Sequence, residues 1–407
     1  MRLWSQYGFP LALAALVGSL PGCGMLGRGA HFAAARSFSP VSFSLTAAAD
    51  EALARAERLE SAGDARCVEA YFAACAWSWQ ACAENLPAPA ANARDRYHAA
   101  LTGLLRTGQR FGRLDPGRGL SVRAGDQWQT VPLVFQGFAW NPADFQRLRP
   151  PPQGREPLLS RRYERAGWGV PLVVERRRNE GDALEARFFP ERSAFAATAV
   201  LRFDRDAAPE GDSSEGSGAT LLFYNPLAIS AVDFAGPTMP LAADLSAPLA
   251  ALLEEAPRTY LAGFIEPGRA NSVARLQFLE PYQPGKIPVV LIHGLFSDPL
   301  SWADLINDLR AAPAFDDRFQ VWTYRYPTGQ GFLQSAARLR RELEDAVAML
   351  NAAGEDPALR RMVLVGHSMG GLIAKLQVTH SEERFWARLA NRPLETIVTT
   401  ELTRAII

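Results

Sequence analysis

The apolar positions of the chain follow three successive patterns, and each pattern predicts a different architecture. From about residue 45 to residue 105 apolar residues recur every three to four positions, as on the buried face of an amphipathic helix. From residue 113 to residue 285 short apolar runs alternate with turns rich in Gly, Pro and Asp, which is typical of β-strands. From Lys286 onward strand-like and helix-like segments alternate, which favours a parallel sheet with helices on both faces.

Three helices are expected in the first pattern, over residues 47–59, 66–84 and 90–105. Helices paired through short turns resemble a tetratricopeptide-type hairpin, but a single copy favours a plain helical cap. The second helix carries Cys67, Cys75 and Cys82. At about 1.5 Å rise per residue, neighbouring pairs are too far apart for a disulfide within that helix. We therefore expect three thiols packed as small apolar side chains.

The second pattern predicts a mainly antiparallel β region without a catalytic constellation of charged or aromatic residues. Its expected strands cover residues 130–135, 170–175, 197–203, 219–224, 260–265 and 274–279. The last two runs could instead open the sheet that follows, so the boundary lies between about residues 255 and 286. We place it at residue 286.

The third pattern contains a motif that carries chemistry, Gly366-His367-Ser368-Met369-Gly370. Four apolar residues before it read as a buried strand, and the apolar residues after it continue at helical spacing. A serine at such a strand-to-helix turn is typical of a nucleophile elbow. The turn leaves no room for side chains two residues to either side, which explains the glycines at 366 and 370.

A second segment, Ile287–Ile292 followed by His293-Gly294-Leu295-Phe296, lies upstream. Together the two segments resemble the esterase/lipase branch of the α/β-hydrolase superfamily. The resemblance covers about the last 120 residues. It implies a parallel α/β-hydrolase sheet with Ser368 as the catalytic nucleophile. It also implies an oxyanion hole made by the backbone amides of Leu295 (or Phe296) and Met369, with Gly294 in the turn that presents the first amide.

A serine nucleophile needs a histidine base that is oriented by a carboxylate, and in this superfamily both follow the serine. Five histidines occur, His31, His98, His293, His367 and His380, and none is a credible base. The later acids, Glu382, Glu383, Glu395 and Glu401, read as solvated helix faces. We therefore expect a C-terminally truncated, partial hydrolase sheet in a chain that is inactive alone.

The function expected from these motifs is hydrolysis of acyl esters, with a small-molecule or lipid ester as substrate. Two alternatives remain open: an acyltransferase that uses the same serine, and a non-catalytic binding or scaffold protein. No cofactor is expected, and no Cys/His spacing suggests a metal site. The formal net charge is zero, so nothing suggests a nucleic-acid partner.

The N-terminus reads as a targeting signal. Arg2 precedes the apolar run Pro10–Val17, which is too short to span a bilayer and has the length of a signal-peptide core. The sequence Leu20-Pro21-Gly22-Cys23 resembles a bacterial lipobox, although Pro21 departs from the small residue usual there. We expect export to the bacterial cell envelope and a membrane anchor through a lipid on Cys23.

These expectations divide the chain into five parts. They are a signal peptide (1–22), a tether (23–44), a helical region (45–112), a β-rich region (113–285) and an incomplete α/β-hydrolase domain (286–407).

Overall fold

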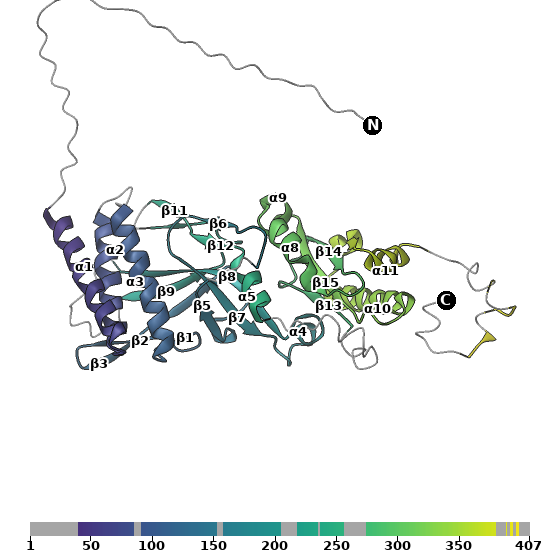
Figure 1. Ribbon diagram of the computed structural model, residues 1–407, viewed down its shortest axis with the longest axis horizontal. Helices are drawn as coiled ribbons and strands as arrows, with labels where there is room; N and C mark the ends of the chain where they lie inside the picture. The colour runs from purple at the N-terminus through teal and green to yellow at the C-terminus, as the bar shows by residue number, and fades with distance from the viewer. Residues whose placement is uncertain are drawn as a thin grey trace, which may run out of the picture. The chain divides into compact units, whose positions relative to one another are not determined.

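A computed structural model of the protein describes residues 40–84, 91–152, 158–204, 218–234, 237–255 and 274–379, with 388, 391–393 and 396–398. The expected signal peptide, Cys23, most of the expected tether and the expected strand at 260–265 lie outside the described residues. The described part of the chain begins with a helical layer and continues through a β region to a mixed α/β region (Figure 1).

The helical layer consists of α1 (Pro40–Ser61), α2 (Cys67–Glu84) and α3 (Ala91–Arg110). The helix α1 begins at Pro40, within the range that the sequence analysis assigned to a tether. The cysteines of α2 are free and buried, which confirms their expected packing as apolar side chains. None of the helices in the described ranges is long and apolar enough to cross a membrane.

The β region is built on a five-stranded sheet in which neighbouring strands are mainly antiparallel. In spatial order the strands are β4 (Leu133–Gln136), β9 (Ala219–Tyr224), β8 (Arg192–Phe203), β7 (Val170–Arg177) and β5 (Arg147–Arg149). Only the pair β4–β9 of this sheet is parallel. The prediction of a mainly antiparallel β region is therefore confirmed.

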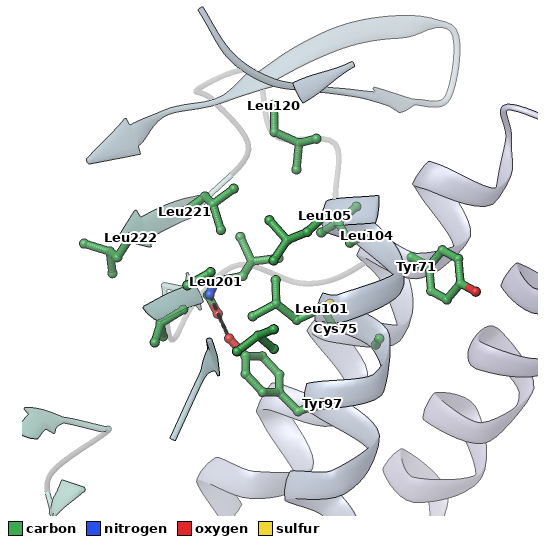
Figure 2. Close-up of a cluster of buried hydrophobic side chains, with 14 of the residues drawn as sticks. Tyr71, Cys75, Tyr97, Leu101, Leu104, Leu105, Leu120, Leu201, Leu221 and Leu222 are labelled. Atoms are coloured by element: carbon green, nitrogen blue, oxygen red, sulfur yellow. Dashed lines mark hydrogen bonds between the residues drawn. The ribbon is translucent and has the colours of Figure 1, made fainter. Parts of the chain in front are cut away.

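The helical layer covers this sheet and shares its core. Figure 2 shows Tyr97 and Leu101 of α3 beside Leu201 of the sheet. The Tyr97 hydroxyl donates to the Leu201 carbonyl oxygen (2.7 Å) and accepts from the Leu201 N–H (2.8 Å). Because the phenol is fully buried, these bonds satisfy a polar group that would otherwise be costly to desolvate. The three helices therefore act as a cap on the sheet, as expected.

Smaller elements complete the β region. They are an antiparallel sheet of β1 (Leu114–Asp115), β2 (Gly119–Ala124) and β3 (Gln127–Val131), the pairs β6 (Glu164–Arg165) with β12 (Ala243–Asp244) and β10 (Ala231–Asp233) with β11 (Thr238–Pro240), and the helices α4 (Ala183–Phe188) and α5 (Ala247–Glu255).

The mixed α/β region contains a four-stranded sheet in the order β13 (Arg275–Phe278), β15 (Phe319–Arg325), β14 (Ile287–Ile292) and β16 (Val363–Gly366). The last three strands are parallel, whereas β13 runs antiparallel to β15. The strand β13 precedes the expected boundary at residue 286 but pairs within this sheet, which is one of the alternatives that the sequence left open.

Helices pack on both faces of the sheet. They are the 3-10 helix η3 (Pro299–Trp302), α8 (Ala303–Arg310), α9 (Pro313–Asp316), α10 (Phe332–Leu350) and α11 (Met369–Gln377). Along β14, Val290 and Ile292 share a core with α10 and α11, while Val289 and Leu291 share another core with α8. Alternate side chains of a strand point to opposite faces, so both faces of β14 are buried. The expected α/β architecture is confirmed.

The short helix α4 links the β region to the mixed α/β sheet. Its residue Phe188 is fully buried and stacks on Phe278 of β13, with ring centroids 4.9 Å apart. The adjacent Arg187 forms an ion pair with Glu342 of α10 at 2.6 Å. Residues of the β region therefore contribute to the apolar core of the mixed α/β sheet.

Candidate functional site

The segments that resemble hydrolase motifs follow the carboxyl ends of neighbouring parallel strands. His293 follows β14, Tyr326 follows β15, and Ser368 lies just after β16. Since these strands are parallel and adjacent in the sheet, their carboxyl ends meet at one edge. This edge is where open α/β sheets usually bind their ligands.

Ser368 occupies the turn between β16 and α11 in a strained backbone conformation. Its φ is 53° and its ψ is −120°, and its side chain is exposed. Positive φ is rare for a residue with a Cβ and persists only where the surrounding structure enforces it. The turn is closed by the Gly370 N–H, which donates to the His367 carbonyl oxygen at 2.9 Å.

The glycines at 366 and 370 are required by close backbone contacts. A Cβ on Gly366 would lie 2.5 Å from the Gly370 carbonyl carbon. A Cβ on Gly370 would lie 2.5 Å from the His293 carbonyl oxygen and still closer to that of Ile292. No side chain fits at these distances, so α11 can begin this close to β14 only with glycine at both positions.

The turn after β14 lies directly against the elbow. A Cβ on Gly294 would be 3.2 Å from the His367 carbonyl oxygen and 3.4 Å from the Ser368 Cβ. Two residues later Phe296 has a φ of 55°. Among the described residues other than glycine, only Phe296 and Ser368 have positive φ. The two strained positions therefore belong to two turns that touch.

Backbone N–H groups are available in both turns. Within the described residues, the N–H groups of Leu295 and Met369 have no hydrogen-bond acceptor in the protein. Met369 is the first residue of α11, where the N–H groups of a helix lack intrahelical partners and the helix dipole favours negative charge. The side chains of Leu295 and Phe296 are 44% and 49% exposed, so the turn is open to solvent.

His293 is a buried neutral side chain with both ring nitrogens engaged. Burial lowers the pKa of His293 to about 4. Its Nε2 accepts a long hydrogen bond from the Tyr326 N–H (3.4 Å), and its Nδ1 lies 3.0 Å from the Gly294 carbonyl oxygen. The ring also stacks on Tyr326, at 4.3 Å between centroids. His293 therefore has no free nitrogen to accept a proton from Ser368.

The other described histidines do not supply a base either. The Nε2 of His98 accepts from the Gly169 N–H at 3.1 Å, and burial lowers the pKa of His98 to about 4. His367 precedes Ser368 in the elbow, and within the described residues its ring forms no hydrogen bond with the Ser368 hydroxyl. Of the histidines and later acids that the sequence offered as candidates, His31, His380, Glu382, Glu383, Glu395 and Glu401 lie outside the described residues.

Sequence reasoning missed Tyr326. Its hydroxyl donates to the His293 carbonyl oxygen at 2.7 Å, and its side chain is 4% exposed. Burial raises the pKa of this phenol, so it remains protonated and able to donate. The position of Tyr326, directly after the strand that pairs with β14, was the signal that could have identified it.

Comparisons with known proteins agree with this geometry. Residues 289–393 match a family model described as the alpha/beta hydrolase family, and this range contains both turns. No curated protein and no solved structure matches the chain. The match supports an alpha/beta hydrolase domain in this part of the chain and, in general terms, a hydrolase-like function.

Proposed function

We propose that the protein is a serine hydrolase of acyl esters and that Ser368 is its nucleophile. The observation that carries the proposal is the positive φ of Ser368 at the turn from β16 to α11, with the Gly294 turn in contact. This geometry presents a serine hydroxyl at the ligand-binding edge of a parallel sheet. The family match supports the general class of reaction.

In the proposed reaction the Ser368 Oγ attacks the carbonyl carbon of the ester, and its proton passes to a general base. The bond from the carbonyl carbon to the leaving alcohol then breaks, and the alcohol takes up that proton. A water molecule hydrolyses the acyl-serine and restores the hydroxyl. The base and its carboxylate are not among the described residues that contact Ser368.

The developing oxyanion would be held by backbone N–H groups. We assign this role to Met369 together with Leu295 or Phe296, because Met369 begins α11 and the other two follow Gly294 in the adjoining turn. The loss of one such donor typically costs about 3–4 kcal/mol of transition-state stabilisation. Because the donors belong to the backbone, side-chain changes at these positions should be milder.

The exposed apolar side chains near Ser368 favour a substrate that is an uncharged ester carrying an apolar group. Leu295 and Phe296 are about half exposed, and Leu372, one helical turn after Ser368, is 51% exposed. A small-molecule or lipid ester could cover these side chains. This feature favours apolar esters over strongly charged ones.

The proposal is tested by labelling the full chain with a fluorophosphonate and locating the adduct by peptide mass spectrometry. The adduct should form on Ser368, more slowly than on a serine that has a histidine base, and should be absent in Ser368→Ala. The variant Ser297→Ala is the matched control, because Ser297 lies in the adjacent turn and should not be needed for labelling. A folded protein that never acquires the label at Ser368 would favour a non-catalytic binding protein.

We also propose that the protein is exported and anchored to the membrane through a lipid on Cys23. The support comes from the sequence alone, with Arg2, the apolar run Pro10–Val17 and the lipobox-like residues before Cys23. A lipid anchor would hold the proposed hydrolase at a bilayer surface, where lipid esters are available. The test is given with the predictions below.

A further inference from the structure

The peptide group between Gly294 and Leu295 is held from its carbonyl side by the His293 ring. A trans peptide is planar, so its C=O and N–H point in opposite directions. The Gly294 carbonyl oxygen lies 3.0 Å from His293 Nδ1, and the Leu295 N–H has no protein acceptor among the described residues. Whatever fixes this C=O therefore also fixes the direction of the free N–H.

The partners of the His293 ring decide which of its nitrogens carries the proton. The Tyr326 N–H is a donor only, so Nε2 must act as the acceptor in that contact. A neutral imidazole then carries its proton on Nδ1, which donates to the Gly294 carbonyl oxygen. The ring is 1% exposed, and its burial disfavours the doubly protonated form.

Tyr326 holds the same turn through two further contacts. Its hydroxyl donates to the His293 carbonyl oxygen at 2.7 Å, which fixes the peptide group before Gly294. Its ring lies nearly parallel to the imidazole, at 14° between planes, and limits rotation of the His293 side chain. Two consecutive peptide groups are therefore restrained by one stacked pair of side chains.

We propose that His293 and Tyr326 are positioning residues that aim the Leu295 N–H at the oxyanion of the reaction. The inference rests on the proposed function of Ser368 and selects Leu295, rather than Phe296, as the donor in this turn. His293 acts only through the peptide group and transfers no proton. An oxyanion donor is effective only when it is held in place before the reaction begins.

The test compares His293→Leu with His293→Asn, two variants of similar size. The asparagine amide can place an N–H donor near the position of Nδ1, whereas leucine offers none. We measure kinact and KI for the fluorophosphonate separately, because its phosphoryl oxygen occupies the oxyanion position as the adduct forms. His293→Leu should lower kinact about 10- to 100-fold with little change in KI. An N–H that points away from the oxyanion stabilises the transition state less, and the largest possible loss is that of removing the donor altogether.

Two further variants separate positioning from general stability. Tyr326→Phe retains the stacked ring but loses one hydrogen bond, so kinact should fall about 2- to 10-fold. His98→Leu removes another neutral histidine, which is half-buried and makes no contact with the site, so it should destabilise the fold without changing kinact. Urea unfolding of each variant gives the loss of stability against which the change in kinact is compared.

The outcomes distinguish this inference from the function on which it rests. A folded wild-type protein that is never labelled contradicts both. Labelling of the wild type, with equal kinact in His293→Leu and His293→Asn, contradicts the inference alone. A fall in kinact that merely follows the loss of stability, and that His98→Leu shows as well, also contradicts it. Retention of kinact in His293→Asn together with its loss in His293→Leu supports the inference.

Discussion

The two neighbouring glycines at the start of α11 give a matched test of how the elbow is built. In Gly370→Ala the new Cβ would lie 2.5 Å from the His293 carbonyl oxygen and closer still to that of Ile292. In Gly371→Ala the nearest atom to the new Cβ is the Gly366 carbonyl oxygen, at 3.4 Å. The same change one residue apart therefore meets a clash in one case and an ordinary contact in the other.

The magnitude follows from which atoms would have to move. Overpacking a core typically costs 1–3 kcal/mol and sometimes more. The atoms that clash with a Cβ at Gly370 belong to the backbone at the end of β14, which cannot rotate away as a side chain could. We expect a loss of about 3 kcal/mol or more for Gly370→Ala. Gly371→Ala should be neutral or stabilise by up to about 1 kcal/mol, because alanine restricts the unfolded chain.

The assay is urea unfolding of both variants, with hydrogen exchange of residues 287–292 and 363–377 to locate the effect. Gly370→Ala should lower the unfolding midpoint and speed exchange in both segments, and Gly371→Ala should do neither. Because the chain has several regions, unfolding need not be two-state, and the exchange data assign the change to the elbow. Equal midpoints and equal protection in the two variants would refute the proposed steric cause.

Four further predictions follow from buried, exposed or chemically marked positions. Burial lowers the pKa of His98 to about 4, so between about pH 6.5 and pH 4 the unfolded chain binds a proton at this residue and the folded chain does not. The free energy of unfolding should therefore fall as the pH drops through this window, by up to about 3 kcal/mol from His98. Urea unfolding of His98→Gln should show a shallower dependence on pH than the wild type. Phe188→Ala should destabilise the protein by about 3–5 kcal/mol, because it leaves a cavity in a fully buried position beside Phe278. The measurement is urea unfolding, and an unchanged midpoint would contradict the packing of α4 in this core. Cys23→Ser should release the protein from the membrane fraction of the expressing cells, and unchanged fractionation would count against a lipid anchor. Hydrolysis of simple esters by the 407-residue chain should be slow, because no described residue serves as a base for Ser368 and an unassisted serine forgoes about 10²–10⁴-fold of the rate. Rapid turnover that Ser368→Ala abolishes would point to a base outside the described residues.

Local patterns in the sequence predicted much of the fold, because these elements depend on the residues of one segment and not on contacts with distant segments. The run at residues 219–224 is mainly apolar and ends in two aromatic residues, and it forms β9 over the same residues. The alternation after Lys286 gave the parallel strands and covering helices in their observed order. The glycine spacing around Ser368 reflects a steric demand that is satisfied within a few residues. Such features need no knowledge of distant parts of the chain.

Contacts that depend on strand pairing could not be predicted in the same way. The stacking of Tyr326 on His293 joins two strand ends that are far apart in sequence and adjacent only because β14 pairs with β15. The sequence placed His293 in a turn but did not indicate which of its ring nitrogens would carry the proton. That assignment depends on a backbone N–H donated from the neighbouring strand end.

The position of α4 shows that the change in sequence pattern near residue 286 does not coincide with a division between apolar cores. Composition changes near residue 286, where strands begin to alternate with helices, but the apolar contacts do not divide there. Phe188 and Phe189, from the connection between β7 and β8, lie in the same core as Phe278 and Trp322 of the mixed sheet. Since a core is defined by burial and not by chain order, the β region supplies part of the interior on which the hydrolase-like sheet rests. The strands that carry Ser368 and the Gly294 turn are therefore stabilised in part by residues that no hydrolase motif includes.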